Sequence, residues 1–122
     1  MESLNTKVWN AIIDISPVQF GVYDLEQHLQ IYSSGLAEKV SGYTFDELQK
    51  FSKDFYQELI LKEDFPQFEN NLIRLLQSDK DLVVESIYRV RDKHGDLIWV
   101  RSNHRVLERD EQGQPIKLIA SS

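Results

Sequence analysis

Histidines are the side chains in this sequence best suited to chemistry, because an imidazole titrates near neutral pH and can bind a metal ion. The chain has three of them, and His28 and His94 both fall in predicted turns, where a solvated histidine is the simpler explanation. His104 shares an alternating register with Ser102 on the apolar side of a predicted strand. We therefore expect His104 to face the interior near Tyr88, where it could form hydrogen bonds with a bound polar group or with the protein itself.

Motifs for catalysis are otherwise lacking. The adjacent carboxylates Asp46-Glu47 and Glu63-Asp64 are explained more simply as helix caps, and neither pair suggests an acid and a base facing each other across a pocket. The sequence has no glycine-rich phosphate loop, no metal-binding helix signature and no Cys, which excludes a thiolate nucleophile and cysteine-ligated metal. We expect a domain that is not an enzyme. A small α+β enzyme would have to use His104 as its acid or base.

The composition is that of a single ordinary globular domain. Its 122 residues are 41% hydrophobic and 28% charged. The net charge of −6 has the wrong sign for a nucleic acid backbone. No apolar run approaches the ~20 residues of a membrane-spanning helix, and the first residues do not resemble a secretion signal. We expect a cytoplasmic location, no nucleic acid partner and no membrane contact by this segment.

An amphipathic helix is predicted at the N-terminus. Leu4, Val8 and Ile12 recur at helical spacing, and the helix should stop just before Pro17, because the residue before a proline is pushed out of the helical region. Trp9 widens the apolar face beyond what docking on a small domain needs. We therefore expect a second partner surface on this helix.

The next segment alternates between strand and helix signals. Short runs at 19–23 and 29–32 are rich in β-branched and aromatic residues and predict a hairpin. A short helix is expected to end at Gly42, which readily takes the left-handed conformation beyond a helix end. Thr44 and Glu47 then form a capping box at the start of another helix.

The second half of the chain begins with a longer helix. Asp64 should cap it, Phe68 and Leu75 share its buried face, and it should end near Ser78. Three strands are predicted after it, at 84–91, 97–107 and 116–120, with turns between them. Such segregated runs indicate an α+β domain with one antiparallel sheet and the helices packed on one face.

Several short motifs occur in a characteristic order along the chain. They are Gly42-Tyr43-Thr44 with Glu47-Leu48, Glu63-Asp64 before the long helix, Glu85 with Tyr88-Arg89, Asp92-Lys93-His94-Gly95, Trp99-Val100, and Asp110 with Gly113 and Pro115. In this order and spacing the chain resembles the PAS domain family over about residues 4–121. The resemblance is to the fold-3 branch found in bacterial sensor histidine kinases and diguanylate cyclases.

The resemblance implies a five-stranded antiparallel sheet in the order 2-1-5-4-3, with helices cupping a cavity against one face. It implies an N-terminal amphipathic helix at 1–17 and a PAS sensor domain at 18–122, excised from a larger signal-transduction protein with an output domain in the same polypeptide. Binding of a small ligand in the cavity, or the state of a partner protein, would be signalled to that output domain. A ligand-free module that only forms a homodimer is the alternative.

Candidate site residues follow from this arrangement. Those expected to contact a ligand are Val22, Ile31, Tyr88, Val100, Ser102 and His104. Those expected in a homodimer interface are Leu4, Val8, Trp9, Ile12 and Trp99. The outward register of the second hairpin should carry a solvated, charge-paired face made by Arg89, Arg91, Arg101 and Arg105 with Glu85 and Asn103. Trp99 and Ile87 lie among these charges, which suggests a docking surface that the N-terminal helix could cover within one subunit or across a dimer.

The cofactor of such a domain stays unknown from the sequence. Haem-binding relatives usually carry an axial His on the long helix, and residues 62–78 contain none, which argues against haem. Light-sensing relatives need a Cys for a flavin adduct or a thioester chromophore, so both are excluded here. Non-covalent flavin is disfavoured but needs no Cys.

Overall fold

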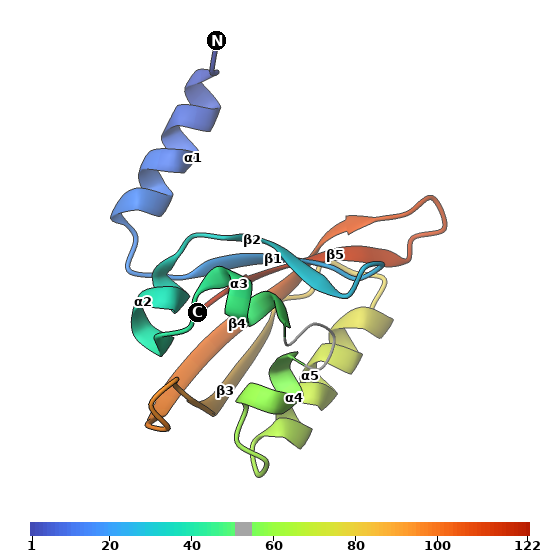
Figure 1. Cartoon of the computed structure of the whole chain (residues 1–122). Coiled ribbons are helices and arrows are strands. Elements are labelled where there is room, and N and C mark those ends of the chain that lie inside the picture. The colour runs from blue at the N-terminus through green and yellow to red at the C-terminus, as the bar shows by residue number, and fades with distance from the viewer. Residues whose placement is uncertain (51–54) are drawn as a thin grey trace.

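The computed structural model describes residues 1–50 and 55–122, with side chains over 1–47 and 57–122. Its elements in chain order are α1 (Leu4–Ile15), β1 (Phe20–Asp24), β2 (Leu29–Ser33), α2 (Leu36–Ser41), α3 (Phe45–Lys50), α4 (Phe55–Leu59), α5 (Phe65–Gln77), β3 (Val84–Arg91), β4 (Leu97–Arg109) and β5 (Pro115–Ser121). Figure 1 shows α1 apart from a curved sheet and its helices.

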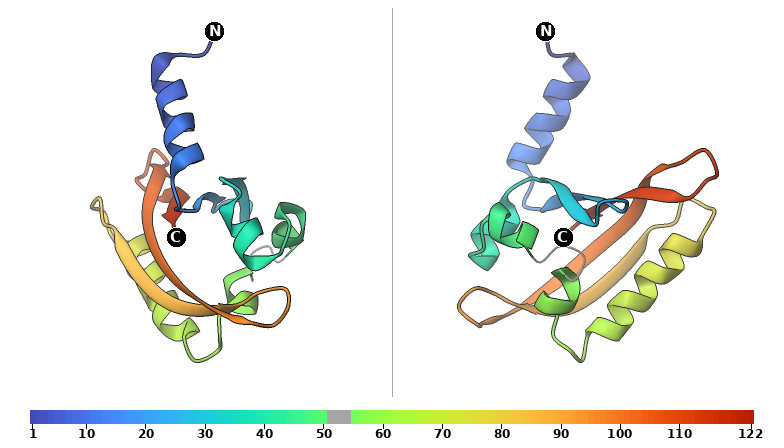
Figure 2. Two further views of the ribbon diagram at one scale, coloured as in Figure 1. Left: turned by 90° about the vertical axis from the view of Figure 1, so that its left-hand side faces the viewer. Right: turned by 45° about the vertical axis from the view of Figure 1, so that its right-hand side comes forward.

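The sheet is five-stranded and antiparallel, in the order β2-β1-β5-β4-β3. This confirms the predicted fold class and strand order. β1 and β5 lie side by side at its centre, so the two ends of the domain meet there. Figure 2 shows how strongly the sheet curves, with the short helices across its hollow side.

The core lies between α5 and the strands β3, β4 and β5. Phe68 and Leu75 are buried on one face of α5, as predicted from their spacing. Phe68 packs edge-on against Tyr88 on β3, with 4.9 Å between ring centroids. Leu75 packs with Val84 and Leu118 in a second buried cluster. One long helix therefore fills one part of the sheet's inner face.

Asp64 stands at the N-cap position of α5 but does not cap it, so that prediction is wrong. Its carboxylate accepts hydrogen bonds from Arg89 instead, at 2.8 Å from the backbone N–H, from Nε and from Nη2. The Leu61 N–H donates back to the Arg89 carbonyl at 2.8 Å. β3 is an edge strand, and this segment satisfies backbone groups that the edge would leave open.

Arg89 is therefore not part of a simply solvated face. Its guanidinium also lies 5.2 Å from the ring centroid of Trp99, in a cation–π contact. Arg91, Arg101 and Arg105 are exposed, and Arg105 lies 3.7 Å from Asp81. The outer face keeps the predicted charges, and at one edge the half-buried carboxylate of Asp64 fixes it through Arg89.

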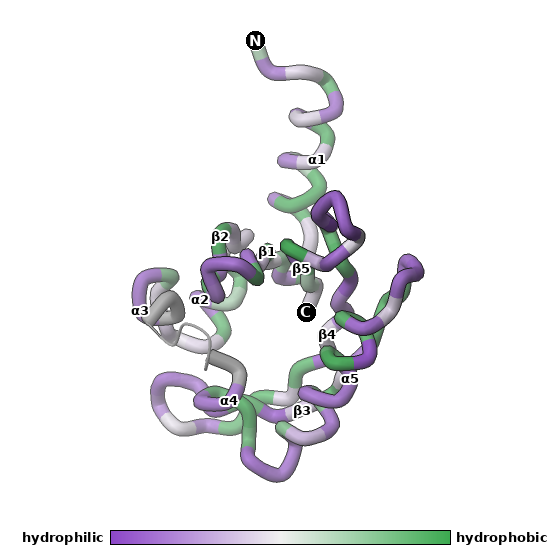
Figure 3. Tube along the Cα trace, turned by 90° about the vertical axis from the view of Figure 1, so that its right-hand side faces the viewer, coloured by the Kyte–Doolittle hydropathy of each residue, from purple (hydrophilic) through white to green (hydrophobic). Residues whose placement is uncertain are grey.

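The helix α1 makes no substantial contact with the other elements that the structure describes. Ser3 caps it by accepting a hydrogen bond from the Thr6 N–H, and none of its residues is buried. Trp9 is 64% exposed and Trp99 is 68% exposed, so α1 does not cover Trp99 within the subunit. Figure 3 shows hydrophobic and hydrophilic segments alternating along α1, away from the sheet. None of the helices over the described residues is long and apolar enough to cross a membrane.

Replacing Asp64 by Asn should destabilise the fold in a pH-dependent way. Hydrogen bonds from Arg89 lower the pKa of Asp64 from 3.8 to about 2. The charged contact therefore stabilises the fold above pH 3.8, and this contribution is lost as the pH falls towards 2. We expect Asp64→Asn to lower the urea midpoint at neutral pH, and the difference from wild type to shrink below pH 4. The exposed Asp79→Asn is the control, and a constant difference across this range would contradict the assignment.

Candidate functional site

A cavity of about 320 Å³ lies against the inner face of the sheet, beside the part that α5 fills. This volume is at the small end of the range typical of ligand pockets. The sheet contributes Gly21, Tyr23, Gln30, Tyr88, Val90, Ile98, Val100, Ser102, His104 and Ala120 to its lining. The short helix α2 contributes Leu36, Ala37, Val40 and Ser41, and Leu59 and Ile60 close the side near α4.

Four of the predicted ligand contacts come together in this cavity: Tyr88, Val100, Ser102 and His104. Val22 and Ile31 do not line it, and Ile31 is 44% exposed on β2. Their neighbours Gly21, Tyr23 and Gln30 line it instead, because side chains alternate between the faces of a strand. The two misplaced residues are therefore off by one position.

Buried polar groups gather at the inner end of the cavity. The hydroxyls of Tyr88 and Ser102 are hydrogen-bonded to each other, and His104 is 1% exposed beside them. The Phe68 ring packs edge-on to the His104 imidazole, with 5.7 Å between centroids. This cluster places neutral hydrogen-bonding groups in a mostly apolar space.

Burial keeps this cluster uncharged. It lowers the pKa of His104 from 6.5 to about 4, and it raises the pKa of Tyr88 to about 12 against the opposing effect of the Ser102 hydrogen bond. Both side chains are therefore neutral at neutral pH. No group of three or more His, Cys, Asp or Glu side chains that could hold a metal ion occurs in the part of the chain that the structure describes.

Gln19 is a cavity residue that the sequence did not single out. It is buried just before β1, and its side-chain amide forms hydrogen bonds with Phe20, Ser33, Ser34 and Ala37. A buried polar residue opening an apolar strand is the one sequence signal that could have drawn attention to it. It joins β1, the end of β2 and the start of α2 at one side of the cavity.

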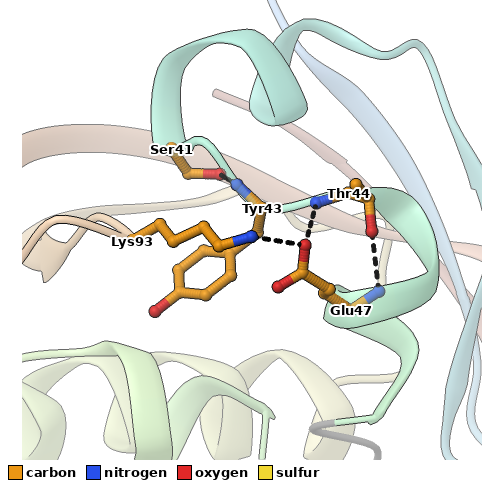
Figure 4. Close-up of polar contacts among 5 residues, drawn as sticks. All are labelled: Ser41, Tyr43, Thr44, Glu47 and Lys93. Carbon is orange, nitrogen blue, oxygen red and sulfur yellow. Dashed lines mark hydrogen bonds and ion pairs between the residues drawn. The ribbon is translucent and has the colours of Figure 1, made fainter.

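The opposite end of α2 is held by the turn between β3 and β4, where the Lys93 N–H donates to the Ser41 carbonyl at 2.8 Å. Lys93 Nζ also lies 2.9 Å from Glu47 Oε1 (Figure 4). Glu47 and Thr44 also form the predicted capping box, with 3.1 Å from the Glu47 N–H to Thr44 Oγ1 and 3.4 Å from the Thr44 N–H to Glu47 Oε1. The hydrogen bond from Lys93 is the main reason that the pKa of Glu47 is lowered.

Comparison with known proteins gives this architecture its family. A family model described as PAS fold matches residues 30–122. A sensory box histidine kinase/response regulator from Burkholderia thailandensis has a TM-score of 0.70 at 22% identity, over 93% of this chain and 80% of that one. The N-terminal domain of a diguanylate cyclase with a PAS/PAC sensor from Marinobacter aquaeolei has a TM-score of 0.71 at 18% identity, over 85% of this chain and 91% of that one.

A third similar structure is the PAS-B domain of Cycle from Drosophila melanogaster with bound ethylene glycol. Its TM-score is 0.69 at 19% identity, over 85% of this chain and 97% of that one. No curated protein gave a significant match. At these identities the solved structures show a shared fold. The family model covers most of the chain, and the chain belongs to the PAS family.

Replacing His104 by Leu should flatten the pH dependence of stability. Above pH 6.5 His104 is neutral in both states, whereas between 6.5 and about 4 only the unfolded chain takes up the proton. Wild type should therefore lose about 2 kcal/mol more stability than His104→Leu between pH 7.5 and pH 5. Urea unfolding at several pH values measures this, with the exposed His94→Gln as the control. Parallel pH profiles for wild type and His104→Leu would refute the burial effect.

Proposed function

We propose that this PAS domain is a non-enzymatic sensory module that binds a small, uncharged, mostly apolar molecule in its cavity. The observation that carries this proposal is the cavity itself, a mostly apolar space of about 320 Å³ whose lining includes the buried polar side chains of Gln19, Ser102 and His104. The ethylene glycol in the Cycle PAS-B structure supports a ligand of modest size. We propose in addition that the module controls an output domain in a bacterial histidine kinase or diguanylate cyclase. We also propose that it is located in the cytoplasm.

The ligand should be uncharged because the described lining offers no buried counter-charge. Apart from Trp99 and Arg101, its polar side chains are amides, hydroxyls and one imidazole. Arg101 also borders the cavity, but it is exposed and occupies the outward register of β4 between Val100 and Ser102. A carboxylate or ammonium group inside would lose its hydration without compensation, at a cost of several kcal/mol.

The ligand would act by shifting a conformational equilibrium. The short helix α2 forms one wall of the cavity and buries none of its residues, so little apolar packing fixes its position. A ligand that contacts α2 and the sheet together would favour the closed arrangement over more open ones. The attached output domain would respond to the change in populations.

Filling the cavity should abolish binding without unfolding the domain. We expect indole, which is apolar with one N–H donor, to shift amide NMR signals of wild-type residues around Ser102 and His104. Val100→Phe adds bulk inside the cavity and should lose this response. Leu107→Phe places a phenyl ring on the exposed face of β4 and should keep it.

The charge of the probe tests the ligand class in the same experiment. Indole-3-carboxylate should bind at least about 100-fold more weakly than indole, because its carboxylate would be buried without a partner. Equal binding of the two would contradict an uncharged ligand. An equal response of both Phe variants to indole would contradict the cavity as the site.

A second candidate function is homodimerisation through α1. The observation that favours it is the helix face formed by Leu4, Val8, Trp9 and Ile12, all four of which are exposed to solvent in the single chain. A second copy could pair its α1 with this face or place it against Trp99. If the cavity binds no ligand, dimerisation would be the domain's function on its own.

Removing the apolar face of α1 should produce a monomer. We expect the double variant Trp9→Ser, Ile12→Ser to change the mass measured by light scattering on a sizing column from dimer to monomer. Lys7→Ser on the same helix should leave the mass unchanged, because it removes no apolar surface. A monomeric wild type at high protein concentration, or a dimeric double variant, would count against α1 as the interface.

A further inference from the structure

The helix α2 lacks a cap of its own at its N-terminus. Its N-cap residue is Gly35, which has a φ of 93° and no side chain to accept a hydrogen bond. The first backbone N–H groups of a helix have no partner within the helix and need an outside acceptor. Gln19 provides it, because its Oε1 accepts from the Ala37 N–H at 2.8 Å and from the Ser34 hydroxyl at 3.2 Å. A residue 18 positions earlier thus caps this helix.

The backbone of the same residue holds the end of the chain. The Gln19 N–H donates to the Ser122 carbonyl at 2.8 Å, and the Ser122 N–H donates to the Gln19 carbonyl at 2.8 Å. Its Nε2 donates to the Ser33 hydroxyl at 2.7 Å and to the Phe20 carbonyl at 2.9 Å. Gln19 also follows the end of α1 at Ile15 by only a few residues.

Polar contacts dominate the attachment of α2 at both ends. Its last carbonyl, on Ser41, accepts from the Lys93 N–H in the turn between β3 and β4. None of its residues is buried. One end of α2 is therefore fixed to a hairpin turn, and the other end to the point where both chain ends leave the sheet.

We propose that Gln19 is a positioning residue that couples α2, as a lid over the cavity, to the junction of the N-terminal helix and the C-terminal end. Movement of α2 changes the acceptor geometry at Gln19 Oε1, and the Gln19 side chain, held in one conformation by its hydrogen bonds to Phe20, Ser33 and Ser34, carries this change to the Gln19–Ser122 backbone pair. The coupling is a property of the fold and holds with or without a ligand. It goes beyond the proposed function, and its failure would leave cavity binding untouched.

A double-variant experiment tests this coupling without any ligand. Lys39 is exposed within α2. Lys39→Gly should therefore raise the equilibrium constant for local opening of this helix about two- to fivefold relative to Lys39→Ala. Hydrogen exchange followed by NMR reports the amides of Ala37–Ser41 and the paired amides of residues 19 and 122. With Gln19 present, Lys39→Gly should speed exchange at both places relative to Lys39→Ala.

In the Gln19→Leu background the two responses should separate. Loosening α2 should still speed exchange within Ala37–Ser41 but should leave residues 19 and 122 unchanged. An unchanged rate at 19 and 122 with Gln19 present, or the same increase in both backgrounds, would overturn the proposal. Gln19→Asn retains the amide but is one methylene shorter, and it replaces Gln19→Leu if the latter does not give a folded NMR spectrum.

Discussion

The inner face of the sheet is filled by apolar packing over only part of its area, and the other features of the domain follow from this. α5 packs Phe68 and Leu75 against β3, β4 and β5. The remaining area is covered by short helices, of which α2 has half-buried residues such as Leu36 and Ala37 but no fully buried one. An element with so little apolar packing is held largely by directional polar bonds. The bonds from Gln19 and Lys93 to the two ends of α2 have this role.

The same partial filling explains the polar cluster at the inner end of the cavity. Tyr88, Ser102 and His104 lie where α5 stops covering the sheet, on strands whose other inward residues are mostly apolar. A hydrogen-bonding group buried there is costly unless it finds a partner. The opposite pKa shifts of His104 and Tyr88 have one cause, since burial disfavours whichever form is charged. Polarity without charge is therefore the chemical character of the site.

The sequence predicted the fold well because its strongest patterns are periodic spacings of apolar residues. The buried face of α5, and the alternation of Ser102 and His104 with arginines on β4, each allow one structural interpretation, and the structure confirms both. The prediction for Val22 failed because β1 is a short strand with large apolar residues on both faces, so alternation does not decide which face is inward. On β2, Ile31 is skipped in the pairing with β1, so the register there is irregular as well. The predicted cap at Asp64 was wrong because the partner of its carboxylate, Arg89, lies 25 positions away. The sequence pattern of a helix cap covers only neighbouring residues and does not reveal such a partner.

The sequence did not indicate the role of Gln19 because its partners, such as Ala37 and Ser122, are also far away in the sequence. Its position shows that the two ends of the domain are structurally linked. β1 and β5 are neighbours, so the chain enters and leaves the sheet through paired strands. A segment attached to either end of the domain would therefore be connected to the sheet at the Gln19–Ser122 backbone pair. Because α1 makes no substantial contact with the other described elements, its orientation depends largely on this short connection. A small shift there would move the far end of α1 by much more, as expected of a rigid helix that pivots at one end.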